Sequence, residues 1–208
     1  MPLTLVKTSE PVIETIPLDS VKSFLNIAAS VADDDLLSDI IFNTTEYLEA
    51  VTHRQFLTAS FRYSLDCFPM STGWKNSLQW AGDSSSLIRI PRSPLQEVLS
   101  ITYQDTSNVE TTLSPASYGV DTDSEPGRIY LLPGRTWPAT YNIPNAVKIC
   151  FLAGWPSVDE IPRRLRSLLL LVIGDLYHYR RGTSIEDFIQ EVPYVKRLIR
   201  SMNIGDVY

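Results

Sequence analysis

The stretch that most constrains the fold of this 208-residue chain runs from residue 90 to residue 155. Short segments of β-forming residues alternate there with turns built from proline and glycine. The sequence on both sides instead has the apolar spacing of amphipathic helices. We therefore predict an α+β protein, in which an antiparallel β-module of residues 56–155 is inserted into a helical frame. Residues 1–55 and 156–208 form the two parts of this frame, and the second part ends in a docking tail.

Composition and hydropathy favour a soluble globular protein. Hydrophobic residues make up 44% and charged residues 20% of the chain, which is ordinary for folded domains. The longest apolar run covers residues 168–174, far short of the roughly 20 residues that a membrane span needs. The N-terminus has no basic region followed by an apolar core, so it does not resemble a signal peptide. We expect a protein made in the cytoplasm that has no membrane partner.

The negative charge is concentrated before residue 156. Residues 1–155 contain 10 basic and 17 acidic residues, a balance of −7, whereas residues 156–208 contain 8 and 7, a balance of +1. Lysine and arginine supply most of the affinity of proteins for nucleic acid. Tight DNA binding is therefore disfavoured, although an acidic protein remains compatible with DNA that passes nearby without being held.

The sequence offers little for catalysis or metal binding. Cys67 and Cys150 are far apart and have no histidine nearby, so we expect buried thiols in a reducing compartment and no zinc site. The two histidines are 125 positions apart, and no phosphate-binding, hydrolase or metalloprotease motif is present. We predict that the chain is not an enzyme and that it has neither cofactor nor metal.

Two helices are predicted before the β-module. The first begins after Pro17, with Asp19 or Ser20 as its N-cap. The second follows the acidic run of residues 33–35 and ends near His53. Such a run could bind a divalent metal, but acids at a helix start are favoured by the macrodipole, so we favour a cap. For His53, too, a capping role is favoured over a catalytic one.

Within the β-module we predict two hairpins, and between them and the first helices a long loop. The hairpins pair residues 98–104 with 109–113 and residues 118–121 with 128–131. The loop covers residues 69–86 and carries Trp74 and Trp80. These could stack on a sugar or a base, but we favour an anchor for a neighbouring subunit.

The turn of the second hairpin is the main candidate for other chemistry. Asp121, Asp123 and Glu125 alternate as at the start of a calcium loop, but no glycine follows at the sixth position and Leu132 replaces the closing glutamate. We predict a type II turn at Pro126-Gly127, with a weak cation site as the lesser option. A carbohydrate- or cation-binding module is thus the alternative function. A hydrolase using Asp121 and Asp123 is weaker still, because neither has an evident base or nucleophile beside it.

After the β-module, residues 161–179 form a helix that is apolar all round in its middle. A helix of this kind must be buried on more than one side. We expect a second subunit to supply the extra cover, with the β-module as the alternative. Gly182 is expected to end the helix, and a short amphipathic segment follows at residues 192–202. The predicted subunit-interface residues are Leu168, Leu169, Leu171, Val172, Ile173 and Leu176.

The serial order of these features resembles the head-tail connectors of tailed bacteriophages, and in particular the long branch of head-completion adaptors that has a β insert. The resemblance covers roughly residues 17–181 and is weakest over residues 183–208. The segments that carry it are PLDSVKSFLNI, DDDLLSDII, TTEYLEAVTHRQF, FRYSLDCFP, IPRSPLQEVLSITYQD, YGVDTDSEPGRIYLLPGRTWP, VKICFLAGW and IPRRLRSLLLLVIGDLYHYR.

This resemblance implies a structural virion protein of the neck, assembled in the host cytoplasm. Members of the family form a ring, commonly of about twelve subunits, below the portal protein, and they provide a platform for the stopper or tail-completion protein. DNA would pass through the lumen without specific binding. The helical frame would pack the ring, and the last segment would reach the portal. The residues implied in portal contact are Tyr194, Lys196, Arg197, Leu198, Arg200 and Met202.

Overall fold

The computed structural model describes the chain except for residues 1–3, 10–13, 28–32, 70–86, 180–191 and 205–208. The chain divides into two compact units. One, here called the β unit, is built mainly from Thr58–Gly154, and the other, the helical unit, from Pro11–Leu57 and Trp155–Gly205. Helices and antiparallel sheets are both present, which confirms the α+β class.

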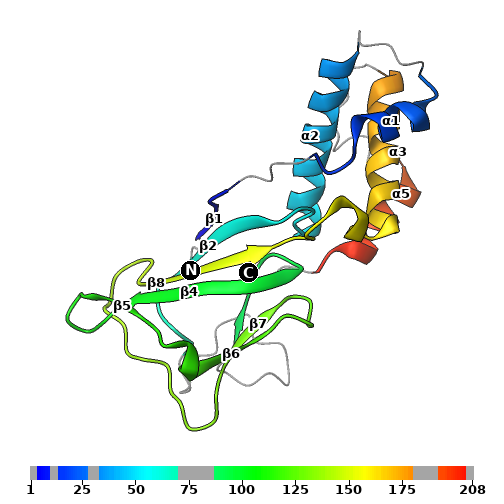
Figure 1. Ribbon diagram of the computed structural model, residues 1–208. Helices are drawn as coiled ribbons and strands as arrows, with labels where there is room; N and C mark the ends of the chain where they lie inside the picture. Colours follow the sequence, from blue (N-terminus) through cyan, green and yellow to red (C-terminus); the bar gives the residue numbers. More distant parts are fainter. Residues whose placement is uncertain (1–3, 10–13, 28–32, 70–86, 180–191, 205–208) are drawn as a thin grey trace. The chain divides into compact units, whose positions relative to one another are not determined.

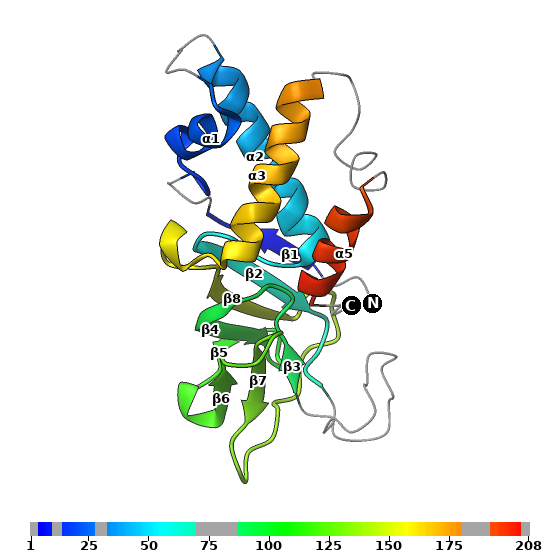
Figure 2. The same ribbon diagram turned by 90° about the vertical axis from the view of Figure 1, so that its right-hand side faces the viewer.

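The helical unit combines segments from both ends of the chain, as Figure 1 shows by its colours. In the described residues its helices are α1 (Leu18–Leu25), α2 (Asp34–Thr52), α3 (Arg163–Tyr179) and α5 (Pro193–Met202), with a short 3-10 turn at Val158–Glu160. In the view of Figure 2, α3 lies between α1 and α5. The apolar stripes of α2 and α3 meet in one core, whose fully buried side chains include Leu37, Leu48, Leu168, Leu169 and Ile173.

The helix ends differ partly from the sequence prediction. The N-cap of α1 is Pro17, not Asp19 or Ser20, and its extended backbone (φ −60°, ψ 135°) lets its carbonyl accept from the amides of Ser20 and Val21. Proline has no backbone N–H to donate to a preceding helical turn. The start of α1 is therefore set by the backbone of Pro17 and not by a capping side chain. His53 ends α2 as its C-cap in the left-handed region (φ 56°), which confirms the capping role.

The larger sheet of the β unit has five strands in the order β1-β2-β8-β4-β5, and every neighbouring pair is antiparallel. Its strands are β1 (Thr4–Lys7), β2 (Ala59–Leu65), β4 (Leu95–Gln104), β5 (Glu110–Thr112) and β8 (Val147–Ala153). The predicted pairing of β4 with β5 is confirmed. Strand β1 was not predicted: the N-terminal segment crosses into this unit and pairs with β2 at the sheet edge.

A second, three-stranded sheet has the order β3-β7-β6, where β3 is Ile88–Arg89, β6 is Tyr118–Asp121 and β7 is Arg128–Leu131. The bounds of β6 and β7 are those predicted from the sequence. Figures 1 and 2 show this sheet beside one face of the larger one. Side chains of both sheets share a core, with Ile88 and Ile129 from the small sheet and Phe61, Ile101 and Phe151 from the large one. Phe61 and Phe151 stack with ring centroids 5.4 Å apart.

The turn between β6 and β7 is not the predicted type II turn. The Glu125–Pro126 peptide is cis, and Gly127 does not have the positive φ that the third residue of a type II turn requires. Gly127 serves another purpose. A Cβ at this position would lie 2.6 Å from the Cβ and Cδ2 atoms of Leu95, so the glycine allows the small sheet to approach β4 closely.

This close approach makes Gly127→Ala a test of sheet packing. Leu95 is only 3% exposed and has little freedom to move aside, so we expect the variant to lose about 1–3 kcal/mol of stability through overpacking. Gly134→Ala is the matched control, since a Cβ there meets nothing within 4 Å. Its φ of +79° still gives alanine some backbone strain, about 1 kcal/mol. Urea denaturation measures the free energy of unfolding of both variants. Equal losses of stability in the two would contradict the packing role of Gly127.

Candidate assembly surfaces

The six residues predicted for a subunit interface separate into two groups on α3. Leu168, Leu169, Val172 and Ile173 are fully buried in the core of the helical unit itself. Leu171 is 39% exposed and Leu176 is half-buried. The apolar side chains of this helix are therefore buried largely within the chain. Of the six predicted interface residues, only Leu171 and Leu176 keep exposed surface for a partner.

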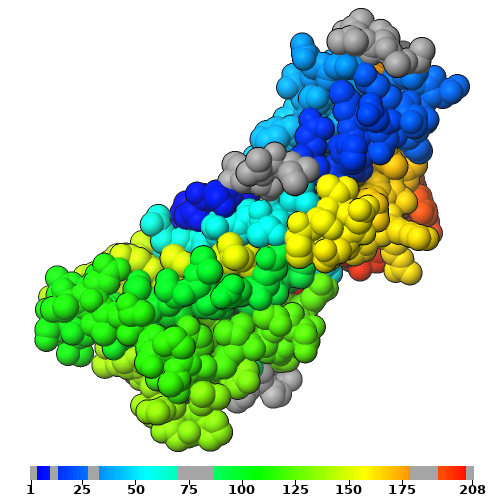
Figure 3. Space-filling view, in the orientation of Figure 1, coloured from blue at the N-terminus to red at the C-terminus, as the bar shows by residue number. Residues whose placement is uncertain are grey.

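Phe24 of α1 packs against α3 at Gly174. Phe24 is 49% exposed, and one carbon of its ring lies 3.2 Å from the place where a Cβ at Gly174 would be. Gly174 follows Leu171 by three residues, so both are on one side of α3. Figure 3 shows α1, coloured blue, packed closely over its neighbours in the helical unit. Exposed apolar side chains thus occur on both helices, Phe24 on α1 and Leu171 on α3.

Further along the exposed side of α3, towards its start, are Arg163 and Arg164, both exposed. Neither forms a hydrogen bond or ion pair with another described side chain, whereas Arg166 bonds to the carbonyls of Ile161 and Asp159 and pairs with the Asp159 carboxylate. Positive charge in the first turn opposes the positive end of the helix dipole. Arg163 and Arg164 are therefore unfavourable to the helix on which they lie.

The portal-contact prediction falls on α5, which is an amphipathic helix as expected. Val195, Ile199 and Met202 face the core of the helical unit, and the Met202 carbonyl accepts from Arg54 Nε at 2.9 Å. Met202 is thus buried inside the chain rather than available for a partner. Of the other residues predicted here, Lys196 and Leu198 are half-buried, and three are exposed: Tyr194, Arg197 and Arg200.

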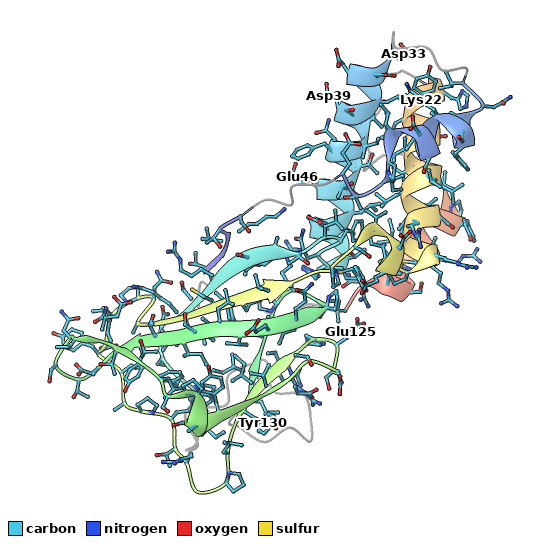
Figure 4. The ribbon with its side chains drawn as sticks, in the orientation of Figure 1. Lys22, Asp33, Asp39, Glu46, Glu125 and Tyr130 are labelled. Atoms are coloured by element: carbon cyan, nitrogen blue, oxygen red, sulfur yellow. The ribbon has the colours of Figure 1, made fainter. Side chains whose placement is uncertain are left out.

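The outer side of α2 carries an acidic stripe that the sequence analysis does not single out. Asp39, Phe42 and Glu46 are all exposed and follow one another at helical spacings of three and four residues. Figure 4 shows Asp39 and Glu46 on the side of α2 that faces away from α3 and α5. Phe42 is 63% exposed. In the sequence, the signal for this acidic stripe is a phenylalanine, Phe42, on the polar side of an amphipathic helix.

Carboxylates of the acidic run at the start of α2 bind side chains of α1 and α3. Asp33 occupies the N-cap position, and its Oδ2 accepts from the Tyr177 hydroxyl of α3 at 2.8 Å. Asp34 pairs with Lys22 of α1 at 2.5 Å. Asp33 is thus the N-cap by position, but its side chain makes no capping hydrogen bond. The carboxylates of the run instead link α2 to α1 and α3. No group of three metal-binding side chains occurs in the part of the chain that the structure describes.

The turn of the small sheet is organised around Asp121. Its Oδ2 accepts from the Ser124 hydroxyl at 2.7 Å and from Arg128 Nη2 at 2.8 Å, and its Oδ1 accepts from the amides of Asp123 and Ser124. The Ser124 hydroxyl and the Arg128 guanidinium hold the pKa of Asp121 at about 2, below its ordinary value of 3.8. This carboxylate is already engaged by donors from its own turn, as expected for a structural corner.

The Asp121 network gives the β unit a defined pH dependence. A lowered folded-state pKa adds stability above the unfolded-state pKa, and this contribution is lost as pH falls from about 4 to about 2. We expect Asp121→Asn to lower the melting temperature most near neutral pH, and the difference from the unaltered protein to shrink towards pH 2. Asp123→Asn is the control, because no donor bonds that carboxylate within the described residues. A constant difference across this range would contradict the role of Asp121.

The remaining candidates are placed as follows. Trp74 and Trp80 lie outside the described residues, as does Gly182. Cys67 is exposed and Cys150 half-buried, so the prediction of two buried thiols is wrong. Cys67 lies two residues beyond the end of β2, where the sheet no longer covers its side chain. Among the described helices, none has the length and hydropathy to cross a membrane.

Exposed aromatic side chains beside charged ones, on helices whose inner faces are already packed, are typical of proteins that bind other proteins. The sequence matches the family described as phage gp6-like head-tail connector protein over residues 15–124. The chain belongs to this family, which confirms the resemblance noted from the sequence. No curated protein sequence matches the chain.

Solved structures share the fold across nearly the whole chain. A chain from the neck of an empty gene transfer agent particle, computed with C6 symmetry, has a TM-score of 0.75 and 19% identity, with 99% of this chain and 97% of that chain covered. A chain from the native particle's neck, computed with C12 symmetry, has a TM-score of 0.71 and 20% identity, with coverage of 99% and 97%. A third, from the native virion, has a TM-score of 0.71 and 21% identity, with coverage of 98% and 97%.

Proposed function

We propose that this chain is a structural neck protein, an adaptor that forms a ring below the portal of a phage or phage-like particle. Membership of the head-tail connector family carries the proposal. The symmetry of the similar neck structures, C6 and C12, supports a ring. We infer a ring of about twelve copies in the virion neck, assembled in the host cytoplasm, with a structural rather than an enzymatic role.

Within this ring the helical frame holds neighbouring subunits together, and the β insert of residues 56–155 shapes one tier. On α3, Leu171 and Leu176 are the predicted interface residues that keep accessible surface. On α5, the exposed Tyr194, Arg197 and Arg200 supply the portal contact. Aromatic and arginine side chains of this kind are enriched at the centres of protein interfaces.

The charge of the chain supports a lumen through which DNA moves freely. The net charge is −6, and an acidic wall offers few cations to bind the phosphates of a passing duplex. The tier away from the portal would form the platform for the stopper or tail-completion protein. The cation-binding alternative gains no support from the Asp121 turn, where Ser124 and Arg128 already engage the carboxylate.

Mass photometry of the purified protein, alone and mixed with the portal protein of the same particle, tests this function. We expect one full ring of copies to add to each portal. A triple variant, Tyr194→Ser/Arg197→Ser/Arg200→Ser, should lose the portal complex without unfolding, because all three side chains are exposed. A protein that stays monomeric and never joins the portal would contradict the adaptor role.

A further inference from the structure

The helical unit has two exposed faces of opposite charge on different helices, and each includes an exposed apolar side chain. The acidic face on α2 consists of Asp39, Phe42 and Glu46. The basic face on α3 consists of Arg163, Arg164 and Leu171. The exposed Phe24 of α1 packs against the same helix at Gly174. We propose that the acidic face of one copy docks on the basic face of the next copy. This inference rests on the proposed ring and identifies the contact that closes it.

The positions of the two faces fit a head-to-tail contact. The inner side of α2 packs in the same core as α3, and Figure 4 shows Asp39 and Glu46 directed away from that core. The two faces are therefore different surfaces of one subunit. A contact between two different surfaces repeats from copy to copy and closes into a ring when the rotation allows it, whereas a contact of one surface with itself stops at a dimer.

The chemistry of the two faces is complementary. Phe42 is 63% exposed and Leu171 39% exposed, so joining them would remove apolar area that the single chain leaves in water. Asp39 and Glu46 flank Phe42 about 4.5 and 6 Å away along the helix axis. They form no ion pair with any described side chain and remain available to the guanidinium groups of a second copy, as Arg163 and Arg164 are available to carboxylates. Both arginines precede Leu171 on α3, so the opposed charges meet beside the apolar contact and help to set which surfaces meet.

Arg163 and Arg164 provide an independent reason. They lie in the first turn of α3, a position that favours acidic residues. Unlike Arg166, they have no partner among the described residues to offset this cost. Residues that break a local rule without compensation inside the chain are expected where function requires them. A carboxylate-bearing surface of a second copy supplies the missing partner.

Charge reversal tests the contact. Asp39→Arg/Glu46→Arg and, separately, Arg163→Glu/Arg164→Glu are each expected to raise the concentration needed for ring formation on the portal at least roughly tenfold. A variant that combines all four changes should assemble again, because the charges face each other with reversed sign. The helix dipole favours acidic side chains in the first turn of α3. Failed assembly of Arg163→Glu/Arg164→Glu therefore cannot be attributed to unfolding. Glu14→Arg/Asp19→Arg makes the same charge change as the first variant on α1 and the segment before it, and should assemble normally.

Disulfide trapping gives a second readout. In a Cys67→Ser/Cys150→Ser background, Phe42→Cys/Leu171→Cys should yield a ladder of cross-linked copies on the portal under oxidation, whereas each single cysteine should yield none beyond a dimer. This contact would be overturned if rings formed normally despite either charge reversal, or if the variant with all four changes did not assemble. The adaptor function would not be affected by either result. Failure of the unaltered protein to assemble would remove the proposed function itself, and the contact with it.

Discussion

Replacing Leu168 with alanine is expected to lower the free energy of unfolding of the helical unit by about 2–5 kcal/mol. Leu168 is fully buried at the centre of the core that α3 shares with α1, α2 and α5. The shorter side chain would leave a cavity lined by apolar groups, and the loss combines the missing transfer free energy with the missing packing contacts. Urea denaturation followed by circular dichroism at 222 nm measures the change.

Leu171→Ala is the matched control for this prediction. It makes the same chemical change one turn away on the same helix, but the side chain is 39% exposed. Leucine and alanine have similar helix propensities, so we expect a loss of less than about 1 kcal/mol. Equal losses for the two variants would show that the buried and exposed sides of α3 are assigned wrongly.

Replacing Glu49 with alanine is expected to cost about 2–4 kcal/mol. Glu49 lies on α2 and is only 7% exposed, and its Oε1 accepts from Gln55 Nε2 at 2.7 Å and from the amide of Phe56 at 3.0 Å. These donors are themselves buried, so removal of the carboxylate would leave them without an acceptor in a dry environment. Both donors belong to the segment that follows the end of α2 at Thr52, so Glu49 holds that segment against the helix.

Two further variants separate this role from a general effect of charge. Glu46→Ala removes the same charge from the exposed side of α2 and should change stability by no more than about 0.5 kcal/mol. Glu49→Gln keeps a side-chain oxygen for the two donors and should lose less than Glu49→Ala. If Glu49→Ala unfolds at the same urea concentration as Glu46→Ala, the buried carboxylate does not stabilise the fold.

Several elements could be predicted from the sequence because local signals and tertiary packing agree there. Strands β6 and β7 have the predicted bounds, since each is a short run that contains β-forming residues and a polar segment with proline and glycine separates them. The end of α2 at His53 likewise follows from the end of a regular apolar stripe. At such positions the apolar residues and the turn-forming residues mark the ends of the elements, although the turn between β6 and β7 is not of the predicted type.

Other features depend on contacts that a sequence pattern does not contain. Gly127 is required by its approach to Leu95, 32 positions earlier in the chain, and not by a positive φ. Strand β1 is four residues long, and only its pairing with β2 defines it. The spacing of α3 shows that the helix is apolar all round, but it does not show that the chain itself buries Leu168, Leu169, Val172 and Ile173.

The candidate surfaces were predictable to the same partial degree. The apolar excess of α3 and the amphipathic pattern of α5 indicated two helices that keep exposed side chains: Leu171 on α3, and Tyr194, Arg197 and Arg200 on α5. The acidic face of α2 was missed, because charged residues on the outer side of a helix are ordinary and only the exposure of Phe42 distinguishes this one. Only the folded chain shows which exposed side chains have no partner, so the sequence pattern alone could not identify this face.

Cryo-electron microscopy of the protein bound to its portal would show whether the chain forms the proposed ring. We expect a closed ring of copies below the portal, with an open lumen and with α2 of each subunit against α3 of its neighbour. Portal particles without added density, at protein concentrations well above those used for assembly, would contradict it.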